Sequence, residues 1–304
     1  MKSALFPKRA LVLAALLAGC GAGCSLKQMA VDRVADTLAG AGGGGVFASD
    51  DDPELVEAAV PFGLKLMETL LAESPEHRGL LEALAAGFTQ YAYGFVLPKA
   101  DELEETDFEA AEAVRARARR LLRRARDYGL RGLEAAHPGF TRALRRDPQA
   151  AVAMTRREDV PLLYWTAAAW GARISLSKDD PAAVSEVPQM EALIDRALAL
   201  DPEWNDGAIH ALLISYEPSR QGAEGAARER AWRHFQEAVA LSGARLAGPF
   251  VAFAEAISVQ EQNFAEFDAL LTQALAIDPD ATPAHRLENL LMQRRARWLR
   301  AHQE

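Results

Sequence analysis

The chain has 304 residues, half of them apolar, and a formal net charge of −9 at pH 7. That excess of acidic groups disfavours a nucleic acid as partner. The sequence has two cysteines, Cys20 and Cys24, both close to the N-terminus. It therefore predicts no disulfide, cysteine nucleophile or cysteine metal site in the folded part of the chain.

The first residues predict a secretory signal peptide over 1–19. Met1–Arg9 carries three basic residues, and Leu11–Ala18 is an apolar run too short to span a membrane as a mature helix. The string Leu17-Ala18-Gly19-Cys20 resembles the bacterial lipobox, in which the cysteine is lipidated and becomes the new N-terminus. We expect lipidation of Cys20, with Cys24 as the alternative. The remaining interpretation is a plain secreted protein whose cysteines are incidental.

The segment 20–48 is interpreted as a lipid-anchored N-terminal segment that contains a glycine-rich linker at Gly40–Gly45. Asp50-Asp51-Asp52-Pro53 follows and is typical of a helix start. Carboxylates favour the positive end of the helix dipole, and proline fits the first helical turn. We expect residues 49–304 to form a single helical domain.

Apolar residues recur at intervals of three and four through this domain, and no segment convincingly alternates apolar with polar residues. The periodicity predicts an all-α fold. Four strings predict helix ends, each with Ser or Asp as the N-cap and Pro opening the next helix. They are Ser74-Pro75, Asp147-Pro148, Asp201-Pro202 and Asp278-Pro279.

These strings resemble the junctions between tetratricopeptide (TPR) helical hairpins. Their prolines lie 73, 54 and 77 residues apart, whereas the regular repeat is about 34 residues long. We therefore expect degenerate TPR-like hairpins stacked into a compact α-α superhelical array. A generic α-helical domain with chance Asp-Pro junctions is the alternative.

Two aromatic segments, Phe88–Phe95 and Leu162–Ser175, predict buried helices. Part of the second segment falls on one helix face, where we expect another helix to pack closely: Tyr164, Ala167, Ala168 and Gly171. Trp165 and Trp170 project to the other sides of that helix. Plain core packing explains any single one of these residues, but together the two segments favour an aromatic-lined internal cavity.

Polar residues follow the third junction, at Asn205, Asp206 and His210. His210 lies four residues after Asp206, so the two side chains can share a helix face. We interpret them as a buried hydrogen-bonded pair or as one polar wall of a ligand site. The candidate lining of the cavity is Tyr91, Tyr164, Trp165, Trp170, Asn205 and His210.

The sequence contains no zinc-protease motif, no Gly-x-Ser-x-Gly, no phosphate loop and no dinucleotide fingerprint. Its six histidines are scattered along the chain. We interpret the protein as a non-enzyme that needs no metal and no cofactor. A hydrolase that uses Asp206 or His210 is the third interpretation.

Several strings together resemble the TatT family, the TPR-repeat lipoprotein component of tripartite ATP-independent periplasmic (TRAP) transporters. The likeness keeps their order over essentially the whole mature chain. The strings are Gly23–Gln28, Phe88–Phe95, Leu163–Gly171, Asp201–Glu217, Gly248–Val251, Ala274–Pro279 and Asn289–Leu299.

The resemblance implies a periplasmic helical protein of degenerate TPR units that associates with a periplasmic solute-binding protein, commonly as a homo-trimer. It also implies an internal pore or cavity that passes a small hydrophobic solute. In the family's frame the lipidated cysteine is the one before Ser25, which is Cys24.

The leading hypothesis is thus a periplasmic accessory subunit of a TRAP-type transporter, attached to a bacterial membrane by its N-terminal lipid anchor. The alternative hypothesis is a lipoprotein TPR scaffold for cell-envelope assembly.

Overall fold

The computed structural model describes residues 32–37, 40 and 45–302, so the expected signal peptide, Cys20 and Cys24 lie outside the described residues. All regular elements in the described part of the chain are helices, and no strand occurs there, which confirms the all-α prediction. The α-helices are α2 (Pro53–Glu73), α3 (Arg78–Tyr91), α4 (Leu97–Leu103), α5 (Phe108–Ala136), α6 (Phe140–Arg146), α7 (Pro148–Val152), α8 (Val160–Ser175), α9 (Pro181–Val184), α10 (Val187–Leu200), α11 (Trp204–Tyr216), α12 (Ala227–Leu241), α13 (Gly248–Phe253), α14 (Phe264–Ala276) and α15 (Arg286–Ala301). Two π-helical turns, η1 (Ala92–Val96) and η4 (Ala254–Ser258), and four 3₁₀ turns, η2 (Arg157–Asp159), η3 (Glu217–Ser219), η5 (Pro279–Ala281) and η6 (Pro283–His285), complete the set.

The start of α2 has the cap that the sequence predicts. Asp52 Oδ1 accepts a hydrogen bond from the backbone N–H of Leu55 at 2.9 Å, and Pro53 occupies the first helical position. The proline needs no hydrogen bond there, and the aspartate satisfies one of the N–H groups that the first turn leaves free.

All four predicted junctions lie at the end of a helix, but a single one of them, Asp147-Pro148, also opens an α-helix as expected. Asp147 ends α6, and its Oδ1 accepts from the N–H of Ala150 at 3.0 Å, with Pro148 as the first residue of α7. In contrast, α3 is capped by His77, α11 begins two residues after Pro202, and Asp278-Pro279 opens a 3₁₀ turn. At these four junctions the string therefore marks the end of one helix more reliably than the start of the next, although Asp52-Pro53 and Asp180-Pro181 elsewhere in the chain both open α-helices.

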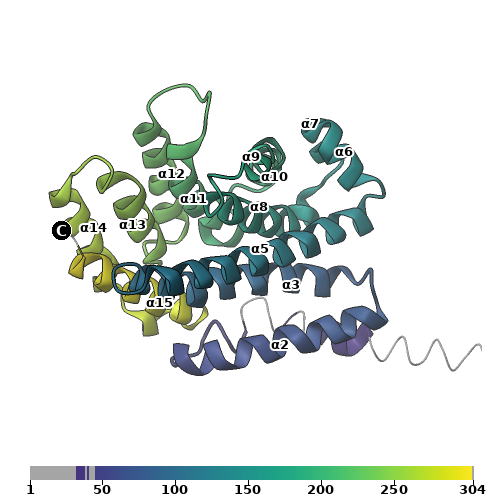
Figure 1. Ribbon diagram of the computed structural model, residues 1–304, viewed down its shortest axis with the longest axis horizontal. Helices are drawn as coiled ribbons and strands as arrows, with labels where there is room; N and C mark the ends of the chain where they lie inside the picture. Colours follow the sequence, from purple (N-terminus) through teal and green to yellow (C-terminus); the bar gives the residue numbers. More distant parts are fainter. Residues whose placement is uncertain (1–31, 38–39, 41–44, 303–304) are drawn as a thin grey trace, which may run out of the picture.

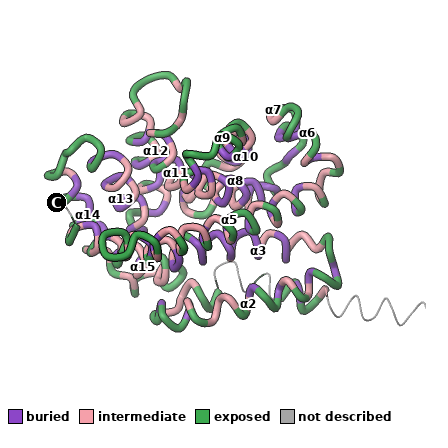
Figure 2. Tube along the Cα trace, in the orientation of Figure 1, coloured by how far each residue is buried: buried purple, intermediate pink, exposed green. Residues whose placement is uncertain are grey.

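The helices form two groups (Figure 1). In the first, α2, α3, α5 and α8 lie in successive layers, each contacting the next, and α10 packs on α8. The second group contains α11 to α15, with α11 against α12 and α14 against α13 and α15. The inner faces of these helices are buried, whereas the outer face of α2 is exposed (Figure 2).

Three apolar cores hold the groups together. One core joins α2 and α3 to α5, with Leu64 and Leu84 among its fully buried members. A second joins α5, α8, α10 and α11 around Leu163 and Ile194. The third, which includes Phe253, lies inside the C-terminal group. Burial of these side chains is the main source of stability in a chain of this kind.

The long helix α5 packs on α8 through two glycines. A Cβ added to Gly129 would lie 2.0 Å from Thr166 Oγ1 and 3.3 Å from the Thr166 Cα. At Gly132 the added atom would lie 2.6 Å from a methyl group of Leu162. Thr166 is fully buried, and its hydroxyl donates to the Leu162 carbonyl at 2.5 Å. The two helices can approach this closely because α5 has no side chain at these positions.

We predict that Gly129→Ala destabilises the protein by about 1–3 kcal/mol, the usual cost of overpacking a tight core. The matched control is Gly63→Ala on α2, where no described atom lies within 4 Å of the added Cβ. That control should be neutral or should stabilise by up to about 1 kcal/mol, because alanine is the better helix former. Urea unfolding followed by circular dichroism measures both variants. Equal stabilities of the two variants would contradict the tight α5–α8 contact.

Candidate functional site

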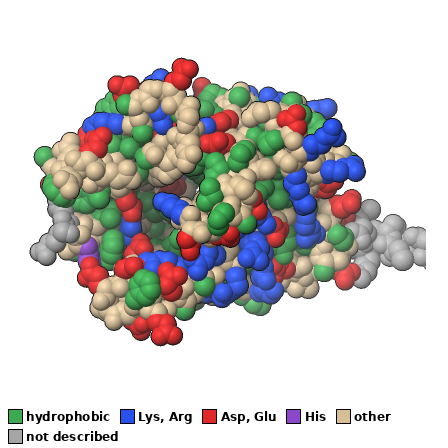
Figure 3. All heavy atoms as spheres, turned by 45° about the horizontal axis from the view of Figure 1, so that its top comes forward, with side chains coloured by type: hydrophobic (Ala, Val, Ile, Leu, Met, Phe, Trp, Pro, Cys, Tyr) green, Lys and Arg blue, Asp and Glu red, His purple; other side chains and the backbone are tan. Residues whose placement is uncertain are grey.

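A cavity of about 1700 Å³ lies among the two groups of helices. Its wall comes from α2, α3, η1, α8, α10, α11, α13 and α15, so residues far apart in the sequence share it. The surface is hollowed, with hydrophobic side chains visible inside (Figure 3). Typical small-molecule sites have volumes of about 300–1,000 Å³. This cavity therefore has room for a ligand larger than a usual metabolite.

The predicted small-residue face of α8 forms part of this wall. Ala168 and Gly171 both line the cavity, together with Tyr164 and Ala167. A second helix, α10, packs on part of this face: Ala167 is fully buried in the core with α10, and Met190 of α10 lies beside Gly171. The face is therefore shared between that helix and the cavity. Its small side chains leave space for a ligand, and the close helix contact of α8 is the one it makes with α5.

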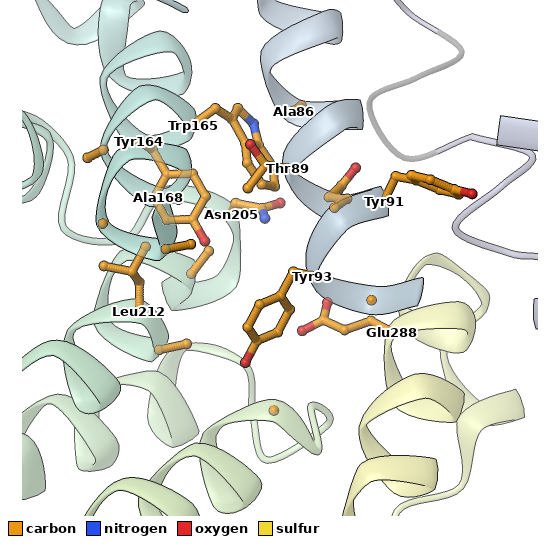
Figure 4. A pocket seen from close by; sticks show the side chains of 18 of the residues that line it. Ala86, Thr89, Tyr91, Tyr93, Tyr164, Trp165, Ala168, Asn205, Leu212 and Glu288 are labelled. Atoms are coloured by element: carbon orange, nitrogen blue, oxygen red, sulfur yellow. The ribbon is translucent and has the colours of Figure 1, made fainter. Parts of the chain in front are cut away.

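Four of the six candidate lining residues line the cavity: Tyr91, Tyr164, Trp165 and Asn205. The Tyr164 ring packs against both Trp165 and Trp204, with ring centroids 4.8 and 4.7 Å away. Figure 4 shows Tyr164 and Trp165 beside each other at the cavity wall. Tyr91 lies toward the α5 side, where its hydroxyl is 3.4 Å from a guanidinium nitrogen of Arg117.

The other two candidates, Trp170 and His210, do not line the cavity. Trp170 is six residues after Tyr164, which turns its side chain about 240° around α8. There its Nε1 donates to Glu186 Oε2 at 2.6 Å, and the Arg126 guanidinium lies 5.1 Å from the ring centroid. These two contacts keep the Trp170 side chain in the packed interior, next to the cavity but outside its lining.

His210 pairs with another histidine instead of with Asp206. The Nδ1 atoms of His210 and His234 lie 2.9 Å apart. Burial lowers the pKa of His210, and burial together with the neighbouring His210 lowers the pKa of His234 to about 4. The pair is therefore uncharged at neutral pH, with one ring donating to the other.

The expected helix face shared by Asp206 and His210 does not form, because the chain is not α-helical at Asp206. Asn205, Asp206 and Gly207 have φ values of 49°, 53° and 87°. These are left-handed conformations, which cost about 1–3 kcal/mol for a residue with a side chain. Asp206 turns to His285, whose Nε2 lies 3.4 Å from its carboxylate. The Asn-Asp-Gly run was the available sequence signal for such a turn.

Two further wall residues, Tyr93 and Glu288, were missed by the sequence analysis. Tyr93 comes from the π turn η1, and its side chain is 55% exposed, toward the cavity. Enclosure by protein raises its pKa to about 12, with a smaller contribution from the Glu255 charge. The aromatic segment 88–95 carried the signal for Tyr93, because this segment favoured an aromatic-lined cavity, but Tyr93 was not among the candidate lining residues.

Glu288 lies in the first turn of α15 and lines the cavity (Figure 4). Its side chain is exposed to the cavity space, and protein surrounds that space. This enclosure raises its pKa to about 7, and the charge of Asp206 adds to the shift. A carboxylate at a helix N-terminus is ordinarily stabilised by the dipole, so enclosure outweighs the dipole here. In the sequence, Glu288 reads as an ordinary first-turn glutamate.

The described residues contain no group of three or more His, Cys, Asp or Glu side chains that could hold a metal ion. No helix in the described part of the chain is both long and apolar enough to cross a membrane. What the cavity offers is aromatic rings, small residues and a few polar groups. Such a lining suits the holding of a mainly apolar molecule.

Fold and site together define an all-α protein built around a large, mostly apolar cavity. The family model described as the TRAP transporter T-component matches residues 49–304, and the chain belongs to this family. It is also similar to an uncharacterized protein of Treponema pallidum (strain Nichols), with 34% identity over 297 residues and 92% of each chain covered. The resemblance seen in the sequence is confirmed at the level of the family.

We predict that Glu288→Gln raises the melting temperature at pH 8 and has little effect at pH 5. The folded protein holds the Glu288 proton more tightly than the unfolded chain does, because its pKa is about 7 instead of 4.5. Relative to the charged form, the protonated carboxyl favours the folded state. This contribution to the free energy of unfolding is fully present below about pH 4.5, the value in the unfolded chain, and is lost as the pH rises to about 7. Glutamine stays uncharged at every pH and keeps that contribution.

Thermal unfolding of the variant and the wild type at pH 5, 6, 7 and 8 tests this prediction. Glu76→Gln is the matched control, because Glu76 is exposed on the surface before α3. A difference in melting temperature that stays constant from pH 5 to pH 8 would show that Glu288 is not enclosed.

Proposed function

We propose that the protein is a lipid-anchored accessory subunit of a TRAP-type solute transporter in the bacterial periplasm. In this proposal it binds a periplasmic solute-binding protein, holds a small hydrophobic solute in its cavity and carries out no catalysis. The observation that carries the proposal is the 1700 Å³ cavity, lined by aromatic and small residues, in a member of the TRAP transporter T-component family.

The lipid anchor is supported by the N-terminal sequence. Leu17-Ala18-Gly19-Cys20 follows a basic head and a short apolar run, so Cys20 is the proposed acyl acceptor, with Cys24 as the alternative. An anchored chain stays close to the membrane subunits of a transporter, and a cavity on such a chain lies beside their periplasmic face. The homo-trimer that the family resemblance implies would place several cavities at one membrane site.

The competing proposal is a lipoprotein scaffold with TPR-like hairpins that serves cell-envelope assembly. It is supported by the Ser-Pro and Asp-Pro strings at four helix ends, which resemble the junctions of TPR interaction repeats. A scaffold needs an exposed docking face and has no use for a large internal cavity. The volume of the cavity therefore favours the transporter proposal.

We predict that the tagged full-length protein, purified gently from its own cell envelope, carries a stoichiometric solute-binding protein. Native mass spectrometry of the complex identifies its partners, detects the acyl chains at the N-terminus and gives the number of subunits. Recovery of cell-wall or secretion components in place of a solute-binding protein would overturn the transporter proposal and establish the scaffold.

The cavity itself is tested by filling it. We predict that Ala168→Trp combined with Ala211→Trp weakens binding of the neutral apolar dye N-phenyl-1-naphthylamine at least about tenfold, or about 1.4 kcal/mol. Both alanines line the cavity, from α8 and α11. The matched control combines Phe62→Trp and Met154→Trp, because both side chains are exposed outside the cavity lining.

Circular dichroism and melting curves show whether each double variant folds. Ala168→Trp alone provides a milder version if the double variant unfolds. Dye binding equal to that of the surface control in a folded cavity variant would show that the cavity does not take up apolar molecules.

A further inference from the structure

Four polar side chains enter the cavity without a protein partner. They are the hydroxyls of Tyr93 and Tyr164, the amide of Asn205 and the carboxyl of Glu288, and they come from η1, α8, α11 and α15. Among the described residues, none of these groups makes a side-chain hydrogen bond. They surround the same part of the cavity (Figure 4). These groups are open to the cavity space, so water pairs with them in the empty protein. A ligand that displaces this water without replacing its hydrogen bonds loses affinity, so the cluster points to a ligand whose polar end pairs with these groups.

The charges of the wall are mostly acidic. The acids that line the cavity are Glu82, Glu191, Asp206 and Glu288, and the basic residues that line it are Lys178, at an exposed position, and His285. No arginine of the described chain lines the cavity. Recognition of a carboxylate or phosphate ordinarily uses arginine or lysine donors. An anionic head group would therefore meet repulsion at this wall.

Among the described residues, the other three acids of the wall each have a polar or charged partner, and Glu288 has none. Glu191 accepts from the Tyr216 hydroxyl at 2.6 Å, and Asp206 lies 3.9 Å from Arg245 and 3.4 Å from His285. The positive charge of Arg78 acts on Glu82. No described residue forms an ion pair or side-chain hydrogen bond with Glu288, whose Oε1 lies 3.4 Å from the position that a Cβ on Gly248 would occupy.

Aromatic rings stand beside the same cluster. The centroids of Tyr164 and Trp204 lie 4.7 Å apart, and those of Trp165 and Trp204 lie 6.4 Å apart. Tyr93 also presents its ring to the cavity (Figure 4). Faces of aromatic rings attract cations, most strongly where water is excluded. An unpaired carboxylate together with aromatic faces is the usual composition of a site for an amine or ammonium group.

We infer that this cluster binds the cationic head group of an otherwise apolar ligand, an alkyl amine or ammonium, with Glu288 as its counter-ion. The inference rests on the proposed uptake of an apolar molecule by the cavity and adds the chemistry of the head group. In this arrangement the Tyr93 and Tyr164 rings flank the cation. The tail lies along the small-residue face of α8 and the apolar side chains of α2.

Binding of a cation is coupled to the proton on Glu288. In the empty cavity this carboxyl has a pKa of about 7, so about half of the molecules carry the proton at pH 7. The cation requires the carboxylate, and its binding releases that proton. The charge of Asp206 on α11 acts on Glu288, and Glu288 in turn acts on Tyr93 of η1 and Tyr164 of α8. His285 and Arg245 lie beside Asp206, and Arg295, Glu255 and Asp101 act on Tyr93.

The test uses three probes with one tail: decylamine, decanol and decanoate, each below its micelle concentration. They displace N-phenyl-1-naphthylamine from the full-length protein. We expect decylamine to bind most tightly and decanoate most weakly. The affinity for decylamine should rise about tenfold from pH 6 to pH 8, following the carboxylate fraction of a group with a pKa of about 7. The affinity for decanol should not rise.

Glu288→Gln should abolish both the preference for the amine and its pH dependence, and the exposed control Glu76→Gln should keep both. Decanoate binding as tightly as decylamine, or an amine preference that survives Glu288→Gln, would overturn the head-group inference. Tight binding of decanol without amine preference would overturn that inference alone. Failure of all three probes and of the dye would overturn the proposed cavity function as well.

Discussion

An apolar cavity of about 1700 Å³ stays open when the helices around it are fixed by packing on their other faces. Protein interiors otherwise collapse to near-crystalline density. The helix α8 shows how this is achieved. On one side of α8, Leu163 and Trp170 pack in the core shared with α10. On a second side, α8 packs closely on α5 at Gly129 and Gly132. The remaining side, with Ala168 and Gly171, is free to be cavity wall.

The polar groups reach the cavity through departures from regular helix. The π turn η1 interrupts the run from α3 to α4 and presents Tyr93, and the left-handed turn at Asn205 and Asp206 delays the start of regular helix in α11. Such turns cost free energy and are found preferentially where a protein has a function. Both occur at the wall of the same cavity. Because both irregular turns lie at this one wall, we interpret them as features that shape the cavity and not only the fold.

The sequence predicted the helical class and much of one wall, because both depend on local periodicity. Tyr164 and Trp165 were found from the aromatic pattern of a single helix. The same pattern suggested Trp170, which failed because its position on the far side of α8 brings it to Glu186 instead of the cavity. The four junction strings predicted where a helix ends but not the conformation that follows, because Asp147-Pro148 opens an α-helix whereas Asp278-Pro279 opens a 3₁₀ turn.

Glu288 could not be predicted, because its environment comes from residues distant in the sequence. The groups around it, Tyr93, Tyr164 and Asp206, precede it by more than 80 residues. Nothing in the local sequence of α15 distinguishes it from other first-turn glutamates, which usually stay exposed. The left-handed turn was accessible in principle from Asn-Asp-Gly, but the apolar residues that follow favoured a continuous helix.

The last helix completes the enclosure and also supplies its acid. The Leu287 N–H donates to the Ala48 carbonyl at 3.0 Å, and an Arg286 guanidinium nitrogen donates to the Ser49 carbonyl at 2.8 Å. Farther along α15, Arg295 pairs with Asp101 of α4 at 2.7 Å and with Glu255 of η4. Partly buried charge pairs of this kind contribute modest net stability but define one geometry. Because Glu288 lies between these attachments, the contacts that close the cavity also fix the position of the carboxyl inside it.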